Sequence, residues 1–271
     1  MMIATARNLL KRNLSPEGFQ RASFAWWVGK FYMPRRVASV VVKRAPVVTG
    51  RPSDFVDRLR RINVFAPTEM CRIMTSYGSD KGNSWHNYTA VYSELFESWR
   101  ARPLPLRVFE LGLGTNNPQL ASTMGVDGRP GASLRGWRKI FPQSLIFGAD
   151  IDRDILFSEE RIQTFYCDQT DAKAIADLWA QPVLRDPMDI IIDDGWHRFS
   201  GNASFLAGSL GHLKPGGIYV VEDIRGVELD EWREALPKYA DQYPNYDFAL
   251  VELPSSFNQY DNNLMLIRKR A

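Results

Sequence analysis

The sequence has few of the residues that define several protein classes. Its 271 residues include only two cysteines, Cys71 and Cys167, and three histidines. Two cysteines cannot form the disulfide framework of a small secreted domain, and they fit a reducing compartment. No uncharged apolar run approaches the ~18 residues that span a bilayer, and the start lacks the residue order of a cleaved secretory signal. We therefore predict a cytoplasmic protein.

Neither sign of charge dominates the chain as a whole. It carries 34 basic and 31 acidic residues, a net charge of +3, with 45% hydrophobic and 24% charged residues. This composition excludes a wholly disordered chain, and the length is enough to bury a sizeable core. The charge is nevertheless uneven. Residues 1–45 hold nine basic residues and one acid, a net of +8, so the remaining 25 bases and 30 acids give −5.

The basic front end is predicted to be helical and admits two interpretations. It is either a solvated extension that packs on the body or on a second subunit, or a peripheral contact with a membrane surface or another polyanion. We expect no nucleic-acid partner. Residues 46–52 are predicted to form a linker and residues 55–62 a short helix. The predicted organisation is a basic extension over residues 1–62, a helical pre-domain over 63–105 and the main domain over 106–271.

From Leu106 onward, short apolar runs alternate with longer amphipathic stretches. This alternation predicts βαβ units, hence an α/β, Rossmann-like fold with a mostly parallel sheet buried on both faces. Two final runs joined by a polar loop predict an antiparallel hairpin at the sheet edge, which gives seven strands. The expected strands cover residues 107–111, 144–149, 164–167, 188–192, 217–221, 248–252 and 264–268.

Acidic residues lie at the ends of five of these predicted strands. They are Glu110, Asp150, Asp168, the pair Asp193/Asp194 and the pair Glu222/Asp223. Ligands of open parallel sheets bind beyond the carboxyl ends of the strands, so these acids mark the expected site. Because like charges repel one another and raise each other's pKa, a cation is expected among them.

The first strand end carries a short glycine-rich turn, with Gly112 and Gly114 after Glu110. The third glycine of a dinucleotide-binding fingerprint is missing, which disfavours an NAD-dependent oxidoreductase. Asp150, after the second strand, offers two acceptor oxygens for the ribose hydroxyls of an adenosine-type ligand. Asp168 has two interpretations, a residue close to the adenine or the N-cap of a helix.

The segments Asp193-Asp-Gly-Trp-His197 and Glu222-Asp223 form the strongest constellation. Carboxylates at adjacent strand ends make a hard oxygen site that suits Mg²⁺. His197 lies three residues beyond Asp194, where it is predicted to serve as a general base rather than as a ligand. His212 is interpreted as structural.

These motifs resemble the class I S-adenosylmethionine-dependent methyltransferases. More narrowly, they resemble the Mg²⁺-dependent sugar O-methyltransferases of macrolide biosynthesis, over roughly residues 70–270. The resemblance rests on five segments: residues 77–82 with His86 and Tyr88, 110–118, 128–137, 193–197 and 222–223. It implies metal ligation by Asp194, Glu222 and Asp223, with His197 as the base. It also implies cofactor binding by Glu110, Gly112, Gly114, Ser133 and Asp150, and it suggests a homo-oligomer.

Three features are not settled by the motifs. The loop Thr115–Ala132 is interpreted as a wall of the acceptor or cofactor pocket. Trp196 stands where this family often has a small residue, so the acceptor pocket is expected to differ in shape. The segment Tyr77–Tyr92, with Lys81 and His86, is interpreted as a flap over the cofactor, a subunit contact or a solvated loop.

The predicted function is methyl transfer from S-adenosylmethionine to a hydroxyl of a sugar or glycosylated natural product. One alternative is a catechol-type O-methyltransferase on a phenol, for which Trp196 and Phe199 would supply an apolar gate. Another is a non-catalytic adapter that keeps the fold.

Overall fold

The computed structural model describes residues 45–82, 85–100, 102, 105–120, 122–125, 127–255 and 258–271. Residues 1–44, which carry the predicted basic helices, lie outside these ranges. All described residues belong to one compact unit, which lies within residues 43–271. Within the described ranges, no helix is long and apolar enough to cross a membrane.

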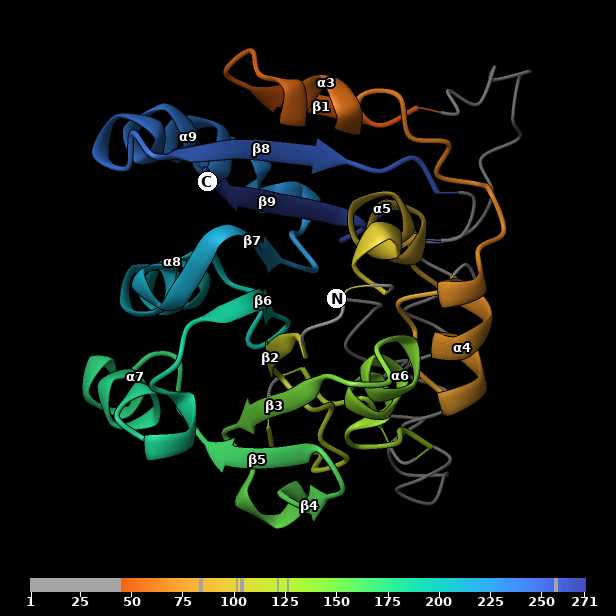
Figure 1. Ribbon diagram of the computed structural model, residues 1–271, viewed down its shortest axis with the longest axis vertical. Coiled ribbons are helices and arrows are strands. Elements are labelled where there is room, and N and C mark those ends of the chain that lie inside the picture. The colour runs from red at the N-terminus through yellow and green to blue at the C-terminus, as the bar shows by residue number, and fades with distance from the viewer. Residues whose placement is uncertain are drawn as a thin grey trace, which may run out of the picture. The chain divides into compact units, whose positions relative to one another are not determined.

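One mixed sheet forms the centre of the described unit (Figure 1). Its strand order is β1-β8-β9-β7-β6-β2-β3-β5-β4. Five neighbouring strands, from β7 to β5, run parallel, whereas β9, β8, β1 and β4 pair antiparallel. The strands are β1 Val47–Gly50, β2 Arg107–Leu111, β3 Leu145–Asp150, β4 Ser158–Glu159, β5 Ile162–Tyr166, β6 Met188–Asp193, β7 Leu213–Val221, β8 Tyr246–Glu252 and β9 Asn263–Lys269.

The predicted α/β fold with seven core strands and an antiparallel β8–β9 hairpin is confirmed. The predicted linker over residues 46–52 is wrong, because Val47–Gly50 forms β1 and pairs with β8. β-Branched residues between two prolines suit an edge strand, since an edge strand tolerates missing backbone donors. β1, rather than the hairpin, therefore closes this edge of the sheet. The short strand β4 closes the other.

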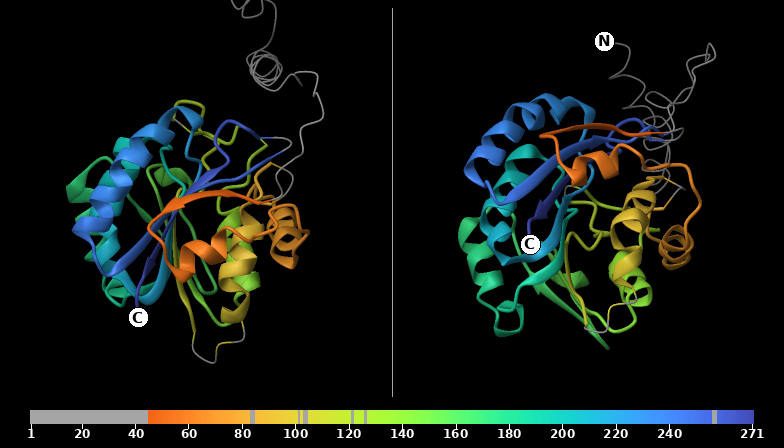
Figure 2. Two further views of the ribbon diagram at one scale, coloured as in Figure 1. Left: turned by 90° about the horizontal axis from the view of Figure 1, so that it is seen from above. Right: turned by 45° about the horizontal axis from the view of Figure 1, so that its top comes forward.

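Helices cover both faces of the sheet, as Figures 1 and 2 show. One hydrophobic cluster lies beneath α3 to α6 and another beneath α7 to α9. On β6, Ile190 and Ile192 belong to the first cluster and Ile191 to the second. A strand buried on both faces needs consecutive apolar residues along its middle, which explains the run Ile190–Ile192. The helices are α3 Asp54–Leu59, α4 Glu69–Tyr77, α5 Tyr88–Phe96, α6 Ala132–Ile140, α7 Ala172–Trp179, α8 Phe199–Ser209 and α9 Leu229–Gln242.

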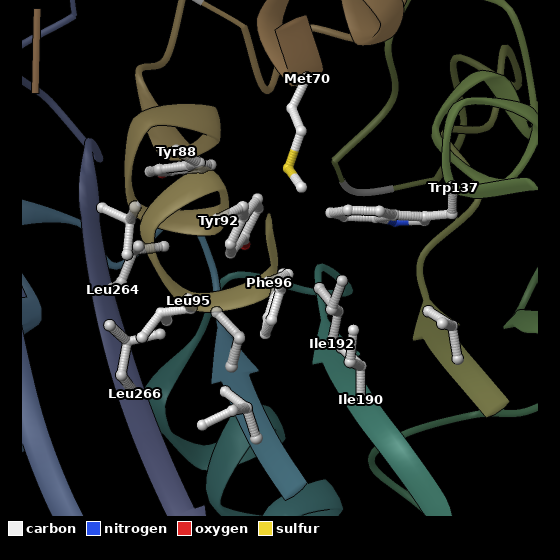
Figure 3. Close-up of a cluster of buried hydrophobic side chains, with 14 of the residues drawn as sticks. Met70, Tyr88, Tyr92, Leu95, Phe96, Trp137, Ile190, Ile192, Leu264 and Leu266 are labelled. Carbon is white, nitrogen blue, oxygen red and sulfur yellow. The ribbon is translucent and has the colours of Figure 1, made fainter. Parts of the chain in front are cut away.

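Aromatic residues spaced four apart on α5 fasten this helix to α6 (Figure 3). The ring of Tyr92 lies 5.5 Å from Phe96 and 5.4 Å from Trp137 of α6, centroid to centroid. Tyr88 and Tyr92 are fully buried, yet each hydroxyl reaches a carboxylate that follows β7. Helix α5 therefore connects the core with the carboxyl edge of the sheet.

Candidate active site

The five acidic strand ends lie side by side at one edge of the sheet. They lie at or just beyond the carboxyl ends of β7, β6, β2, β3 and β5, which are neighbours in that order. Short backbone bonds continue the pairing just beyond the strands: Asp194 N–H donates to Leu111 O at 2.9 Å, and Glu222 N–H donates to Asp193 O at 2.9 Å. The chain leaves β2 for β3 on one side, and β6 lies on the other, so the strand order reverses there. The predicted acids therefore lie around this reversal point.

The glycine turn after β2 packs between the two neighbouring loops. Gly112 has a φ of +91°, and a Cβ placed there would lie 1.9 Å from the carbonyl oxygen of Asp194. On the other side, Leu113 N–H donates to Asp150 Oδ2 at 2.7 Å. Gly112 is therefore required both by its left-handed backbone and by the close approach of the Asp194 loop.

Replacing Gly112 by alanine is expected to destabilise the protein by more than the ~1–3 kcal/mol that a left-handed non-glycine residue costs. The added methyl group would also force the backbone of Asp194 to shift. Gly216→Ala is the matched control, because Gly216 has a φ of +77° and a Cβ placed there would meet nothing within 4 Å. Thermal unfolding of both variants measures the difference. Equal losses would contradict the close packing at Gly112.

The loop between β2 and α6 folds back on itself. Asn116 Nδ2 donates to Gly125 O at 2.6 Å and to Gly128 O at 3.0 Å. Ser122 Oγ donates to the backbone oxygen of Trp196 at 3.4 Å. These bonds bring the loop beside the Asp193–His197 segment, as a pocket wall would require. Its role as that wall stays a prediction.

The side chains of Asp194, His197 and Asp223 come together at this edge of the sheet. One ligand atom from each lies within 4.8 Å of the others, the arrangement that a metal ion needs. His197 Nε2 is 3.2 Å from Asp194 Oδ1, and His197 Nδ1 is 3.6 Å from Asp223 Oδ2. Two carboxylates supply hard oxygen donors of the kind that Mg²⁺ prefers, so the residues fit this ion.

The two aspartates determine the ionisation of His197. Burial alone would lower the pKa of His197, but the facing Asp223 and Asp194 outweigh it and raise this pKa to about 10. Burial likewise opposes the charge of Asp194, yet the ammonium of Lys81 and the His197 ring lower the pKa of Asp194 below its ordinary value. Opposite charges at short range thus prevail over desolvation at this centre.

Lys81 lies fully buried among three carboxylates. Its Nζ donates to Asp194 Oδ2 at 2.6 Å, pairs with Glu222 Oε2 and lies 3.4 Å from Glu110 Oε1. Burial would lower the pKa of Lys81, but these carboxylates raise it well above the ordinary value. The interpretation of this segment as a solvated loop is therefore wrong for Lys81 and for His86, which are 1% and 2% exposed.

Glu222 lies outside the group formed by Asp194, His197 and Asp223. One of its oxygens accepts from Lys81 and the other from the hydroxyl of Tyr92. It is 1% exposed, and burial raises its pKa well above the ordinary value. Asp223, the next residue, turns toward His197 instead. The metal-ligand role of Glu222 therefore stays a prediction, with less support than those of Asp194 and Asp223.

Two predicted cofactor residues contact each other. Glu110 accepts from Ser133 Oγ and Trp137 Nε1, each at 2.5 Å, and burial raises the pKa of Glu110. Glu110 is 0% exposed and Ser133 is 8% exposed. In this arrangement Glu110 anchors the start of α6 beneath the glycine turn. Direct contact of either residue with a cofactor stays a prediction.

Asp150 and Asp168 lie at the ends of the next two strands. Asp150 accepts from Leu113 N–H and, at 2.8 Å, from Asp152 N–H, which leaves further acceptor capacity on its two oxygens. Asp168 accepts from the backbone N–H and the hydroxyl of Thr170. The N-cap of α7 is Asp171, so the N-cap interpretation of Asp168 is wrong. The roles of both acids in cofactor binding stay predictions.

Sequence reasoning missed the residues that hold the acidic loops in place. Gln169 accepts from Trp196 N–H at 2.6 Å and donates to Asp193 at 3.4 Å, so it ties the loop after β5 to the loop after β6. Tyr88 and Tyr92 bind the carboxylates after β7. Their spacing on a helix indicates a core face and gives no signal for these hydroxyl contacts.

The sequence is similar to several curated O-methyltransferases. No protein-family profile matches the chain. It is 34% identical over 170 residues to the 8-demethyl-8-(2-methoxy-alpha-L-rhamnosyl)-tetracenomycin-C 3'-O-methyltransferase of Streptomyces olivaceus, covering 62% of this chain and 40% of that protein. It is 32% identical over 160 residues to the demethylmacrocin O-methyltransferase of Streptomyces fradiae, covering 59% and 37%. The match therefore spans about 40% of the length of these curated relatives.

Solved structures show the same fold. The MycE methyltransferase of the mycinamycin biosynthetic pathway, in complex with Mg and SAH, superposes with a TM-score of 0.56 at 24% identity, covering 76% of this chain and 56% of that one. A second crystal form gives a TM-score of 0.54 at 25% identity, covering 76% and 54%. The chain has the class I methyltransferase fold. The curated relatives confirm the resemblance to sugar O-methyltransferases. In this methyltransferase fold, the glycine turn and the Asp194–His197–Asp223 group share one edge of the sheet.

Proposed function

We propose that the protein transfers a methyl group from S-adenosylmethionine to a hydroxyl of a sugar carried by a natural product. The observation that carries the proposal is the group of Asp194, His197 and Asp223 directly beside the glycine turn. The curated relatives support it, since two of them are named as O-methyltransferases of rhamnosyl-tetracenomycin compounds and another as a mycinamicin VI 2''-O-methyltransferase. Because the chain matches only part of their length, its own activity and acceptor are proposals.

The cofactor would lie over the glycine turn, between the loops after β2, β3 and β5. Asp150 has acceptor capacity left for the ribose hydroxyls, and Asp168 lies at the next strand end, close to where the adenine would lie. Gly112 and Gly114 both have positive φ, so the turn brings backbone atoms to the edge without a Cβ. The donor itself supplies a methyl group on a positively charged sulfur.

Asp194 and Asp223 would hold Mg²⁺, with Glu222 as the third predicted ligand. When bound, the ion would supply a Lewis acid that lowers the pKa of the acceptor hydroxyl. His197 lies between the two aspartates, where one of its ring nitrogens takes the proton of the acceptor hydroxyl. Holding the hydroxyl oxygen in line with the methyl group then provides much of the rate, because the sulfonium is already a good leaving group.

The surface next to His197 bears on the choice of acceptor. Trp196 is 39% exposed and would offer its ring to the apolar face of a sugar or to a planar ring. Phe199 packs edge-on against Trp232 at 4.9 Å, on the inner side of α8. A catechol-type gate made of both residues therefore has less support than a sugar acceptor.

Incubation with methyl-labelled S-adenosylmethionine tests the proposal. The purified protein is given rhamnosylated and macrolide-bound sugars in parallel with catechols, with Mg²⁺ or with EDTA, and the products are identified by mass spectrometry. We expect one labelled methyl group on a sugar oxygen, only with Mg²⁺ present. Transfer to phenols alone would favour the catechol alternative. Failure to bind S-adenosylhomocysteine and metal would favour a non-catalytic adapter. The cytoplasmic location, the homo-oligomer and the partner of the basic segment stay predictions.

A further inference from the structure

Asp223 has a backbone conformation that residues other than glycine rarely adopt. Its φ is +54°, and His197 opposite it has a φ of +55°. Such conformations persist only where surrounding groups hold them, and they concentrate at functional sites. The hydroxyl of Tyr88 contacts Asp223 twice: it donates to Asp223 Oδ1 at 2.8 Å and accepts the backbone N–H of Asp223 at 3.2 Å. One oxygen atom therefore fixes both the backbone and the side chain of Asp223.

Tyr88 is itself fixed from the other side. It is 0% exposed, and the His86 ring stacks on it at a centroid distance of 4.5 Å. His86 Nδ1 is 3.2 Å from the amide nitrogen of Asn258, which can only donate. The hydrogen of a neutral His86 therefore lies on Nε2, which is 3.5 Å from Asp223 Oδ1. Two side chains thus face the same carboxylate oxygen.

The hydroxyl of Tyr88 has a choice of acceptors, since the backbone oxygen of Asp261 lies 2.9 Å away. Its single proton favours the charged carboxylate, because bonds to an ionised acceptor are stronger. A buried tyrosine hydroxyl in this protein does not have to form a hydrogen bond. The hydroxyl of Tyr219 on β7 is also buried, and it has no hydrogen-bond partner among the described residues. The contacts of Tyr88 are therefore more than the satisfaction of a buried hydroxyl.

With Oδ1 held by Tyr88, the second oxygen of Asp223 faces His197 Nδ1 at 3.6 Å. We infer that Tyr88 is a positioning residue, which holds Asp223 so that Oδ2 is presented to the divalent cation and to the base. The inference rests on the proposed metal-dependent function. It assigns to α5, a helix of the core, the orientation of one metal-binding carboxylate.

Tyr88→Phe tests this inference, because it removes the hydroxyl and keeps the ring. Mn²⁺ affinity is measured by the loss of the free-ion paramagnetic resonance signal, and S-adenosylhomocysteine affinity by calorimetry. We expect Tyr88→Phe to weaken Mn²⁺ binding by about 10- to 100-fold, the usual cost of losing a residue that hydrogen-bonds a metal ligand. S-adenosylhomocysteine binding should be unchanged. Tyr219→Phe is the matched control and is expected to change neither affinity.

Equal Mn²⁺ affinity in the wild type and in Tyr88→Phe would overturn the inference. An equal loss of affinity for Mn²⁺ and for S-adenosylhomocysteine, together with a lower unfolding temperature, would also overturn it. Such a result would mean that the tyrosine has a purely structural role. Should Tyr88→Phe fail to fold, His86→Ala replaces it, with a smaller loss of Mn²⁺ affinity expected and an unchanged affinity overturning the inference. A wild type that binds S-adenosylhomocysteine but no Mn²⁺ would instead refute the metal-dependent function on which the inference rests.

Discussion

Replacing His197 by alanine is expected to lower kcat by about 10²- to 10⁴-fold, the usual contribution of a positioned general base. The imidazole lies between Asp194 and Asp223, 3.2 Å and 3.6 Å from their nearest oxygens. Without it, water alone is left to take the proton of the acceptor hydroxyl. Turnover at saturating cofactor, acceptor and Mg²⁺ measures the loss, because saturation removes effects on binding.

The pH dependence gives this prediction a specific signature. Although burial opposes it, the two aspartates raise the pKa of His197 to about 10 when no metal is bound. A divalent cation beside the ring repels the proton, so the pKa in the loaded enzyme is expected to be lower. Only the neutral imidazole accepts a proton, so kcat should fall as the pH falls through the pKa of His197 in the loaded enzyme. This acidic limb should be absent from His197→Ala.

His212 offers a matched histidine control. It stacks on Trp179 at 4.4 Å, after α8 and away from the acidic strand ends, and burial lowers its pKa. We expect His212→Ala to keep the wild-type kcat and pH profile, with at most a loss of stability. Full turnover by His197→Ala, or the same acidic limb in that variant, would show that another group is the base.

Replacing Asp194 by asparagine is expected to weaken Mg²⁺ binding by more than ~100-fold. Losing a residue that only hydrogen-bonds a metal ligand costs ~10- to 100-fold, and Asp194 is a proposed ligand itself. The change removes the negative charge of a proposed ligand and keeps its shape. Asparagine retains a carbonyl oxygen that can still accept from Lys81, so the buried ammonium keeps all three neighbours. Isothermal titration with Mg²⁺ in the presence of S-adenosylhomocysteine measures the affinity.

The control for this change is Asp177→Asn on α7. Asp177 pairs with the exposed Lys173, and its side chain is 62% exposed. Exposed pairs of this kind contribute roughly 0–1 kcal/mol to stability, so little should change. If Asp194→Asn bound Mg²⁺ as tightly as Asp177→Asn, the ion would have to lie elsewhere. Retained turnover of Asp194→Asn in EDTA would likewise contradict a metal-dependent reaction.

The sequence by itself determined the sheet and the edge at which the chemistry lies. A strand buried on both faces needs consecutive apolar residues along its middle, so the run Ile190–Ile192 indicates β6. The acids Glu110, Asp150 and Asp193 stand where such runs end. Parallel strands place their carboxyl ends together, so the cluster follows from the pattern without any knowledge of the strand order. The glycine turn is likewise local, because it depends on backbone conformation.

Only the tertiary structure decided what faces these acids. Lys81 meets Asp194 and Glu222 across 113 and 141 residues of chain, and Tyr88 meets Asp223 across 135. The neighbours Glu222 and Asp223 face different partners, because Asp223 takes a left-handed backbone next to the Tyr88 hydroxyl. β1 joins the sheet only because the edge of β8 is there to receive it. Periodicity and spacing report one stretch of chain at a time, whereas these contacts exist only once segments distant in the sequence have packed together.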